Sequence, residues 1–320
     1  MKMKDTIKRT AKKLFYSAPK ELRANFMGFE DSQLTELSKS IESNYLDRGE
    51  TKKKLSQWEY EQALHGQLFE RLDYNRNRIV PWLNSIKNLK GSRILEIGCG
   101  TGISTLALAE QGALVTGIDV DQGALNVAKD RLEMAGLKAD IVFANGSEID
   151  KFKEQPFDFI IYYAVLEHMT VPERIESLSK AWAMLPENGL LAIIETPNRL
   201  WYYDSHTAAM PFYDWLPDEL AYYYSKFSPR KNFNDQYRTV TDGDMMKFLR
   251  WGRGASYHEF EIAMDKLSKL KVISSLTQFE KSALIKYGFK GVKYIKFLRS
   301  LKKDLPKGFC YPYLDIIIQK

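Results

Sequence analysis

Short runs of apolar residues alternate with amphipathic segments through the middle of the chain. Runs rich in β-branched and aromatic residues predict buried strands at 93–97, 114–119, 141–144, 157–163 and 190–195. Between them, apolar residues recur every three or four positions, which predicts helices at 103–111, 122–135 and 172–185. Strands that alternate with helices in this order predict an α/β fold, a parallel sheet with helices on both faces.

The regions on either side predict additions to this core. Helical spacing over 30–90 indicates an N-terminal helical extension, and the aromatic-rich stretch 201–277, interrupted by prolines, indicates a cap inserted after the fifth strand. The remaining predicted elements are a helix, a sixth strand and a last strand, at 278–287, 291–297 and 313–319. The expected parts are an extension, a core, a cap and a C-terminal part of the core sheet, at 1–90, 91–200, 201–277 and 278–320.

Three glycines follow the first predicted strand at alternate positions, Gly98, Gly100 and Gly102. A turn this tight needs positive φ angles or a bare backbone, which glycine provides at little cost. The spacing does not fit the G-x-G-x-x-G fingerprint of dinucleotide-binding proteins, because Ile103 stands where the third glycine belongs, and no P-loop sequence is present. Such a loop after a first strand is nevertheless where open α/β sheets bind nucleotide-like ligands.

The second predicted strand ends in an acid. Asp119 follows the glycines by about 20 residues, the spacing at which a carboxylate reaches the two hydroxyls of a ribose. The alternative is that Asp119 caps the helix predicted at 122–135. The glycine run and this acid together resemble the cofactor-binding motifs of the class I S-adenosylmethionine (SAM)-dependent methyltransferases. The run reads Glu96-x-Gly98-x-Gly100-Thr101-Gly102.

This resemblance implies a Rossmann-like, seven-stranded, mostly parallel sheet whose last strand is inserted antiparallel between the fifth and the sixth. It implies SAM as the cofactor. An acid just after the third strand usually contacts the adenine amino group in this family, and Asn145 stands there instead. Its amide oxygen can accept the same bond, and the backbone amide of Gly146 can serve a ring nitrogen. The residues expected to bind the cofactor are Glu96, Gly98, Gly100, Gly102, Asp119, Val120, Asn145 and Gly146.

A further motif lies at the start of the predicted cap. The run T-P-N-R-L-W…D-S-H-T…P-F…W-L-P, at about 195–217, resembles a subset of bacterial methyltransferases related to the ubiquinone-pathway O-methyltransferases. Members of that subset often accompany cell-surface glycan synthesis, which implies a glycan or glycolipid acceptor. Aromatic planes can stack on sugar rings, although the same side chains can form a core of the cap's own. The residues expected to contact the acceptor are Glu195, Arg199, Trp201 and Tyr203.

Two histidines are candidates for the chemistry. Methyl transfer from a sulfonium is an in-line displacement, so the enzyme mainly aligns the nucleophile with the methyl group, but a hydroxyl nucleophile also gains from a base. His168 follows the fourth strand and His206 lies in the cap, and an imidazole titrates near neutral pH. The alternative for His168 is a capping or packing role together with Glu167. No metal-ligand spacing is recognisable, so metal-independent chemistry is expected.

The expected function is SAM-dependent methyl transfer to a hydroxyl of a sugar, glycolipid or other small molecule. Two alternatives remain open: N- or C-methylation of a natural product or quinone precursor, and a SAM-binding module without catalysis, because a fold does not establish a function. A nicotinamide-dependent dehydrogenase is disfavoured by the glycine spacing. The sequence does not indicate an oligomeric state.

Positive charge is concentrated at the N-terminus. Residues 1–24 hold eight Lys or Arg against two acids, and this excess equals the net charge of +6 of the whole chain. The rest is therefore no general polyanion binder, which argues against nucleic acid as a partner. Residues 1–16 show amphipathic helical spacing, which fits either a helix packed on the body or peripheral attachment to an anionic membrane face through 1–24.

Cysteine usage and hydropathy indicate the compartment. Cys99 and Cys310 are the two cysteines, and they are too far apart in sequence to suggest a disulfide or metal framework. No apolar run approaches the ~18 residues of a membrane span, and no apolar segment of a signal peptide is visible. A cytoplasmic protein is expected, with attachment to the inner membrane face as the variant that residues 1–24 suggest.

Overall fold

The computed structural model describes residues 17–48, 55–239 and 245–320. The chain divides into two compact units, Met1–Phe143 and Ala144–Lys320, and each is considered by itself below. The helix expected at 1–16 lies outside the described residues. None of the helices in the described ranges combines the length and the apolar composition that a membrane crossing needs.

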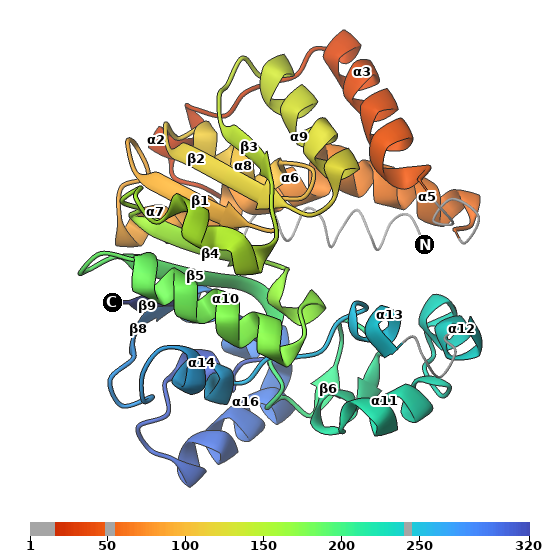
Figure 1. The fold of residues 1–320 in the computed structure, drawn as a ribbon, viewed down its shortest axis with the longest axis vertical. Helices are drawn as coiled ribbons and strands as arrows, with labels where there is room; N and C mark the ends of the chain where they lie inside the picture. Colours follow the sequence, from red (N-terminus) through yellow and green to blue (C-terminus); the bar gives the residue numbers. More distant parts are fainter. Residues whose placement is uncertain (1–16, 49–54, 240–244) are drawn as a thin grey trace. The chain divides into compact units, whose positions relative to one another are not determined.

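The strands form one seven-stranded sheet in the order β3-β2-β1-β4-β5-β9-β8 (Figure 1). β1 pairs parallel with β2, β2 with β3, and β4 with β5, whereas β9 is antiparallel to both of its neighbours. This confirms the Rossmann-like α/β fold and the antiparallel last strand. The strands are β1 (Arg93–Ile97), β2 (Leu114–Asp119), β3 (Asp140–Phe143), β4 (Phe159–Tyr163), β5 (Leu190–Pro197), β8 (Lys271–Ser275) and β9 (Tyr313–Gln319).

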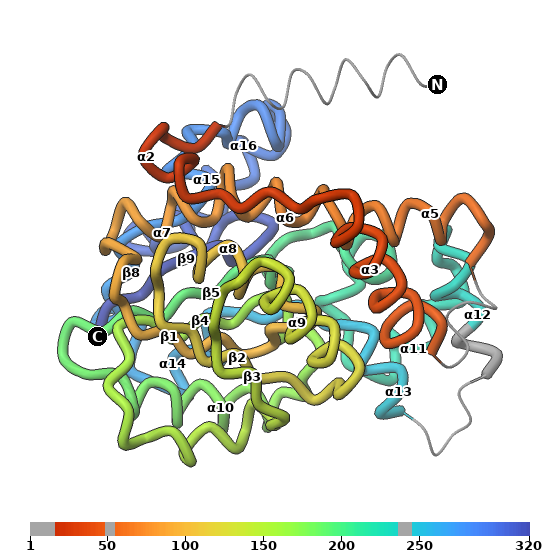
Figure 2. Tube along the Cα trace, turned by 90° about the horizontal axis from the view of Figure 1, so that it is seen from above, coloured from red at the N-terminus to blue at the C-terminus, as the bar shows by residue number. Residues whose placement is uncertain are grey.

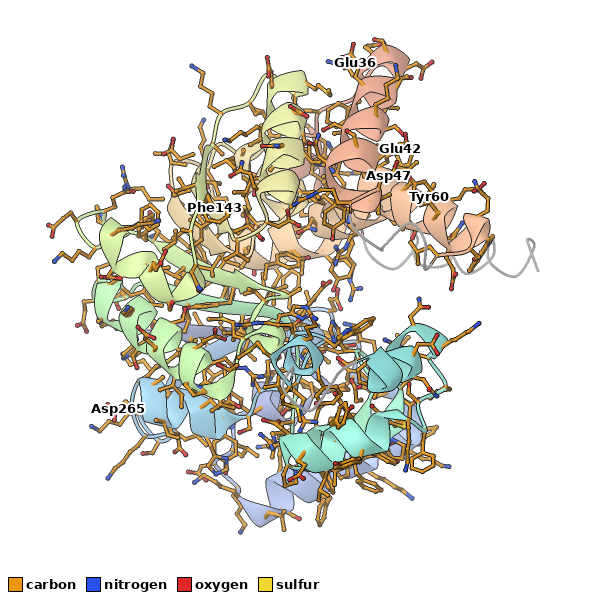
Figure 3. The ribbon with its side chains drawn as sticks, turned by 45° about the vertical axis from the view of Figure 1, so that its right-hand side comes forward. Glu36, Glu42, Asp47, Tyr60, Phe143 and Asp265 are labelled. Carbon is orange, nitrogen blue, oxygen red and sulfur yellow. The ribbon has the colours of Figure 1, made fainter. Side chains whose placement is uncertain are left out.

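The first unit places a helix after β1 and another after β2, and it adds the N-terminal helices. α3 lies alongside α9 (Figures 1 and 2), and the two share the buried side chains of Leu37, Ile41 and Val127. Asp47 accepts a hydrogen bond from the Tyr60 hydroxyl at 2.8 Å, and both residues are labelled in Figure 3. The helices are α2 (Lys20–Arg23), α3 (Asp31–Ile41), α5 (Gln57–His65), α6 (Arg71–Tyr74), α7 (Val80–Ile86), α8 (Ile103–Ala109) and α9 (Gln122–Met134), with π-helical turns at Glu42–Leu46, Gly66–Glu70 and Asn75–Ile79.

The second unit contains the cap and the C-terminal elements. α10 (Val171–Met184) contacts both the short 3-10 helix Gly146–Phe152 and α14 (Tyr257–Ala263). The cap has its own buried core, formed by Ala208, Met210, Tyr213, Ala221, Phe233 and Phe248. Three aromatic side chains, Tyr213, Phe233 and Phe248, therefore pack within the cap. Its elements are β6 (Tyr203–Asp204), β7 (Met210–Pro211), α11 (Asp218–Ser225), α12 (Lys231–Thr239) and α13 (Met245–Leu249).

The strand predicted at 291–297 is wrong, because this stretch lies inside α16 (Ala283–Leu301). The buried residues of α16 are Gly291, Ile295 and Leu298, a spacing of four and three that is helical. Gly288 follows directly after the helix predicted at 278–287, but in the structure it lies inside α16 and kinks that helix at a φ of +62°. The sixth strand of the seven-stranded sheet, in sequence order, is β8. The short helix α15 (Leu276–Phe279) separates β8 from α16.

Candidate active site

The loop after β1 presents its bare backbone. Gly98, Gly100 and Gly102 all have positive φ, at 80°, 51° and 75°. A Cβ built on Gly102 would lie 2.7 Å from the Cβ of Ala128 on α9, so this glycine is needed for close packing. A Cβ on Gly100 would meet no atom within 4 Å. The loop is thus packed against the protein at Gly102 and open at Gly100, where a ligand can contact the main chain.

Asp119 joins this loop to the end of β2. One oxygen of its carboxylate accepts the Gly100 amide at 2.9 Å, and the other accepts the Asp121 amide at 2.9 Å. The N-cap of α9 is Asp121, which accepts the amides of Gly123 and Ala124, so Asp119 does not cap that helix. Each Asp119 oxygen keeps acceptor capacity for a ligand hydroxyl. The next residue, Val120, is 60% exposed and is available to an apolar ring.

Glu96 has a different task from the one expected of it. Its side chain is fully buried, and its two oxygens accept the hydroxyls of Ser104 and Thr105 at the start of α8. Burial raises the pKa of Glu96. Because this carboxylate has no exposed surface, it fixes the strand to the helix across the glycine loop. A direct contact of Glu96 with the cofactor stays a prediction.

Asn145 and Gly146 lie in the second unit, at the start of a 3-10 helix. The side-chain oxygen of Asn145 accepts the Ser147 amide at 3.1 Å, so this residue serves as the N-cap. The carbonyl of Gly146 accepts the Ser177 hydroxyl at 2.5 Å. Both residues are partly exposed. An amide oxygen has two lone pairs, so a contact with an adenine amino group stays a prediction for Asn145.

Three titratable side chains of the second unit meet beside the end of β4. Glu167 and His168 belong to the 3-10 turn Leu166–His168, and His206 lies between β6 and β7. The Glu167 Oε1 atom lies 3.9 Å from the Nε2 atom of His168 and 3.7 Å from that of His206. The two imidazole rings are 5.7 Å apart. The structure therefore brings together both histidines predicted from sequence, and it adds the carboxylate between them.

Hydrogen bonds orient both rings of this Glu167–His168–His206 cluster. The Nδ1 atom of His168 lies 2.8 Å from the Arg250 carbonyl, which can only accept, so this nitrogen carries the proton. The Nδ1 atom of His206 lies 3.0 Å from the Thr207 hydroxyl, and that hydroxyl donates to the Trp251 carbonyl. His206 Nδ1 is therefore also the protonated nitrogen. In both rings the unprotonated Nε2 atom is the one nearer to Glu167.

Glu167 is fully buried and only half satisfied. Its Oε2 atom accepts the Thr196 hydroxyl at 3.4 Å, whereas Oε1 has no hydrogen-bond partner among the described residues. Burial raises the pKa of Glu167 to about 8, and burial also lowers the pKa of His168. A buried acceptor left without a donor is costly. Such a group indicates a site that is completed by something other than these side chains.

The backbone beside the cluster is strained. Ala164, directly after β4, and Glu195, within β5, have φ angles of +47° and +60° although neither is glycine. The Glu195 amide donates to Asp315 on β9 at 2.7 Å, where the pairing of β5 with β9 shifts register. Strained non-glycine residues concentrate at functional sites. The ends of β4 and β5 thus carry a second mark of a site.

Comparisons with known proteins agree with this geometry. Residues 94–189 match the family model of methyltransferase domains. A ubiquinone biosynthesis O-methyltransferase from Aromatoleum aromaticum is 36% identical over 120 residues, which cover 38% of this chain and 50% of that protein, and one from Stutzerimonas stutzeri is 33% identical with the same coverage. This part of the chain therefore resembles a class I SAM-dependent methyltransferase domain.

The likeness has a limited extent. The chain spans about half the length of the curated relatives it matches. Among solved structures, a SAM-dependent methyltransferase from Methanosarcina mazei is 30% identical, covers 34% of this chain and 54% of that chain, and has a TM-score of 0.32. The cap and the C-terminal elements lie beyond the matched methyltransferase domain.

The residues expected to contact an acceptor have different environments. Trp201 is buried among Tyr202, Tyr287 and Tyr294, so little of its ring is open to solvent, and its contact with an acceptor stays a prediction. Tyr203 is 40% exposed, and its hydroxyl donates to the Ala209 carbonyl at 2.9 Å, which leaves the ring available. Glu195 and Arg199 are partly exposed, and their contact with an acceptor stays a prediction.

Sequence reasoning missed three residues in or beside the Glu167–His168–His206 cluster. Glu167 was assigned only to capping or packing, and Thr207 and Arg250 received no role. The signal for Glu167 was its place beside His168 after a predicted strand. The contacts of Thr207 and Arg250 have no sequence signal, because they depend on how the cap folds back to the core of its unit.

Proposed function

We propose that this protein transfers the methyl group of SAM to a hydroxyl oxygen of a small molecule. The open backbone at Gly100 and the adjacent carboxylate of Asp119 support binding of the nucleoside part of SAM. The curated relatives that match the domain are named O-methyltransferases, which agrees with oxygen as the acceptor atom.

The observation that carries the choice of oxygen is the Glu167–His168–His206 cluster. Sulfonium methyl transfer has a good leaving group, and an amine already has a free lone pair at high pH, whereas a hydroxyl must lose its proton to become a strong nucleophile. Two imidazoles with unprotonated Nε2 atoms, beside one buried carboxylate, are suited to assist that loss. A SAM-binding module without catalysis has no need of such a group.

We propose a sugar or glycolipid as the acceptor. Five aromatic side chains in the described part of the cap are exposed: Tyr203 by 40%, Phe212 by 48%, Trp215 by 45%, Tyr223 by 46% and Phe227 by 67%. Exposed aromatic planes supply apolar area at little entropic cost and can stack on the apolar face of a sugar. The motif at 195–217 supports the same class of acceptor. A phenolic quinone precursor is the competing acceptor, and the assay below includes it.

The test combines a binding measurement with a transfer assay. Calorimetry with S-adenosylhomocysteine should show one site per chain, and radiolabelled SAM should label sugar or glycolipid acceptors in preference to catechols. The variant His206→Ala should lose at least about tenfold in kcat while it binds S-adenosylhomocysteine like the wild type. His65→Ala, on α5, is the matched control and should keep full turnover. Absence of S-adenosylhomocysteine binding, or transfer to amines alone, would refute the proposal.

A further inference from the structure

We propose that Glu167, His168 and His206 bind one divalent zinc-type metal ion, and that this ion activates the acceptor hydroxyl. The role in activation rests on the proposed function, whereas the metal site itself does not. The proposal revises the expectation of metal-independent chemistry. Four observations support it: the spacing of the ligand atoms, the protonation of the two rings, the second layer of hydrogen bonds, and the exposure of the rings.

The three ligand atoms lie close enough together to bind one metal ion after small shifts of their side chains. One oxygen of Glu167 and one nitrogen of each histidine all lie within 4.8 Å of one another. The two nitrogen-to-oxygen distances are 3.9 Å for His168 and 3.7 Å for His206. Around a tetrahedral zinc ion with bonds of about 2.1 Å, neighbouring ligand atoms lie about 3.4 Å apart. The two nitrogen-to-oxygen distances would have to close by roughly 0.3–0.5 Å, and the two nitrogens, which lie within 4.8 Å of each other, by at most about 1.4 Å.

The hydrogen bonds of the two histidine rings leave acceptor atoms that a cation could bind. The hydrogen bonds from the two Nδ1 atoms leave the Nε2 lone pairs of His168 and His206 directed to the same place as Glu167 Oε1. Both nitrogens are acceptors, and Oε1, which receives no hydrogen bond from any residue in the described ranges, becomes a ligand when the Glu167 carboxyl loses its proton to the arriving metal ion. A metal ion at this place would bind all three atoms at once. Neutral imidazole bonded through Nε2 is also the form that metals bind.

The second layer resembles that of metal sites in general. Metal-binding histidines almost always donate their other ring N–H to a carbonyl, carboxylate or water, and binding carboxylates are themselves hydrogen-bonded. Here His168 donates to the Arg250 carbonyl, His206 donates to the Thr207 hydroxyl, and Glu167 accepts from Thr196. These contacts hold all three ligands before any metal arrives.

Exposure leaves room for a substrate oxygen. The Glu167 side chain is fully buried, whereas the side chains of His168 and His206 are 41% and 29% exposed. Catalytic zinc sites use three protein ligands and keep a fourth position for water or substrate. Two imidazoles and one carboxylate favour zinc or ferrous iron, because magnesium prefers oxygen ligands throughout. The open position would take the oxygen of the acceptor hydroxyl.

The resulting step is balanced without a further reactant. Coordination lowers the pKa of the acceptor hydroxyl, which loses its proton to water. The alkoxide oxygen then forms a bond to the methyl carbon of SAM. The carbon–sulfur bond breaks, and its electron pair stays on sulfur, which gives neutral S-adenosylhomocysteine.

The experiment is a titration of tag-free, chelator-treated full-length protein with Co²⁺, followed by visible absorption, and with Zn²⁺, followed by calorimetry. One equivalent should bind with a dissociation constant of micromolar or below. Glu167→Gln and His206→Ala should each weaken binding at least about tenfold, and Thr207→Val should weaken it less, because that variant frees the ring without removing a ligand. His65→Ala removes a histidine that lies 3.6 Å from Glu70 on the surface, and it should bind like the wild type.

The outcomes separate the two proposals. Binding of neither metal by the folded wild type, or equal binding by His206→Ala and His65→Ala, would overturn the metal site. Methyl transfer that survives chelation would overturn the activating role. Metal binding in a protein that transfers no methyl group would overturn the proposed function and leave the metal site standing. Circular dichroism of each variant shows whether lost binding reflects lost folding.

We further propose that α16 docks on an anionic membrane surface. Large apolar side chains of this helix stand in solvent: Leu284, Ile285, Phe289, Phe297 and Leu301, with Ile285 74% and Phe289 78% exposed. Lysines interleave with them along the same helix. Apolar anchors together with cations are typical of helices that lie in a membrane interface. A second copy of the chain is a poor partner, because two such faces carry like charges.

A cationic cavity beside α16 fits a phosphate head group. The cavity encloses about 520 Å³ and is lined by Lys296, Arg299, Lys303 and Lys307, with no acid among its described lining residues. The Nε atom of Arg299 is buried and has no hydrogen-bond partner in the described part of the chain. A phosphate oxygen would satisfy this donor, and guanidinium groups match phosphate geometry well. Cavity and helix together point to an anionic lipid.

Flotation of the full chain with vesicles tests this docking. Phosphatidylglycerol vesicles should recover the protein, and phosphatidylcholine vesicles should not. Phe289→Ser should lower recovery on phosphatidylglycerol at least about tenfold, because a buried Phe contributes strongly to membrane affinity. Ile262→Ser is the control, since Ile262 is 68% exposed on α14. Equal recovery of the two variants would overturn the proposal, as would sedimentation showing that Phe289→Ser abolishes a dimer of the wild type.

Discussion

Replacing Gly102 or Gly100 by alanine distinguishes the role of the glycine loop in packing from its role in ligand binding. In Gly102→Ala the new methyl group meets the Cβ of Ala128 at 2.7 Å, roughly 0.7 Å short of the 3.4 Å where ordinary contact begins. The backbone of Ala128 also lies close to the new methyl group, so α9 itself must shift. Overpacking of this kind costs about 1–3 kcal/mol, and an alanine at a φ of +75° costs about 1–2 kcal/mol more. We therefore expect a loss of about 2–5 kcal/mol in the free energy of unfolding.

Gly91→Ala isolates the backbone cost. Gly91 has a φ of +76°, and a Cβ there would meet no atom within 4 Å. This variant should lose only about 1–2 kcal/mol. Gly100→Ala, at a φ of +51° with open space around it, should lose a similar amount of stability. Its methyl group, however, projects from the part of the loop proposed to contact the cofactor, so S-adenosylhomocysteine affinity should fall at least about tenfold.

The assays are urea denaturation of the ligand-free protein and calorimetry with S-adenosylhomocysteine. Equal stability losses in Gly102→Ala and Gly91→Ala would refute the packing argument at Ala128. Wild-type affinity in Gly100→Ala would refute the idea that the ligand lies against the bare backbone. The slope of the denaturation curve should stay unchanged in all three variants, because none removes apolar surface.

Three further predictions concern the second unit. Glu173→Gln should lower the free energy of unfolding by about 1 kcal/mol above pH 5 and leave it almost unchanged near pH 2, because the hydrogen bond from Arg250 lowers the pKa of Glu173 from 4.5 to about 2. Denaturation measured across this pH range tests the prediction, and a difference between variant and wild type that stays constant with pH would contradict it. Arg174→Met should cost about 3–5 kcal/mol, because buried Glu259 loses its partner, and adding Glu259→Leu should restore part of that loss in urea denaturation. Lys320→Met should lower stability by about 1 kcal/mol, because the Lys320 ammonium donates to the last carbonyls of α10; an unchanged melting curve would exclude this role.

Sequence patterns predicted those parts of the fold in which local signals agree. The strand at 114–119 was placed at its observed bounds, because a β-branched run there ends in an acid. The prediction at 291–297 failed because Val292 and Tyr294 alternate with small or polar residues like a strand, while Ile295 and Leu298 are buried at helical spacing. Packing of the helix, which no local pattern reveals, decided between the two periods.

The candidate site was predictable as parts and not as an arrangement. His168 and His206 were each identified, but their meeting at Glu167 depends on the path of the cap between β6 and β7. The burial of Trp201 likewise depends on α16, a helix far along the chain. Motifs specify residues near one another in sequence, whereas this cluster is assembled by tertiary contacts.

The cap leaves and re-enters its unit at one place. The Arg199 amide donates to the Ala255 carbonyl at 2.8 Å, and the Ala255 amide donates to the Pro197 carbonyl at 2.9 Å. An insertion whose two ends are stitched side by side can change in length at small entropic cost, about 0.6 kcal/mol for each doubling. Evolution can therefore exchange the intervening segment as a cassette. Because His206 belongs to the cap, replacing the cap would change the acceptor surface and remove or replace this residue of the Glu167–His168–His206 cluster at the same time.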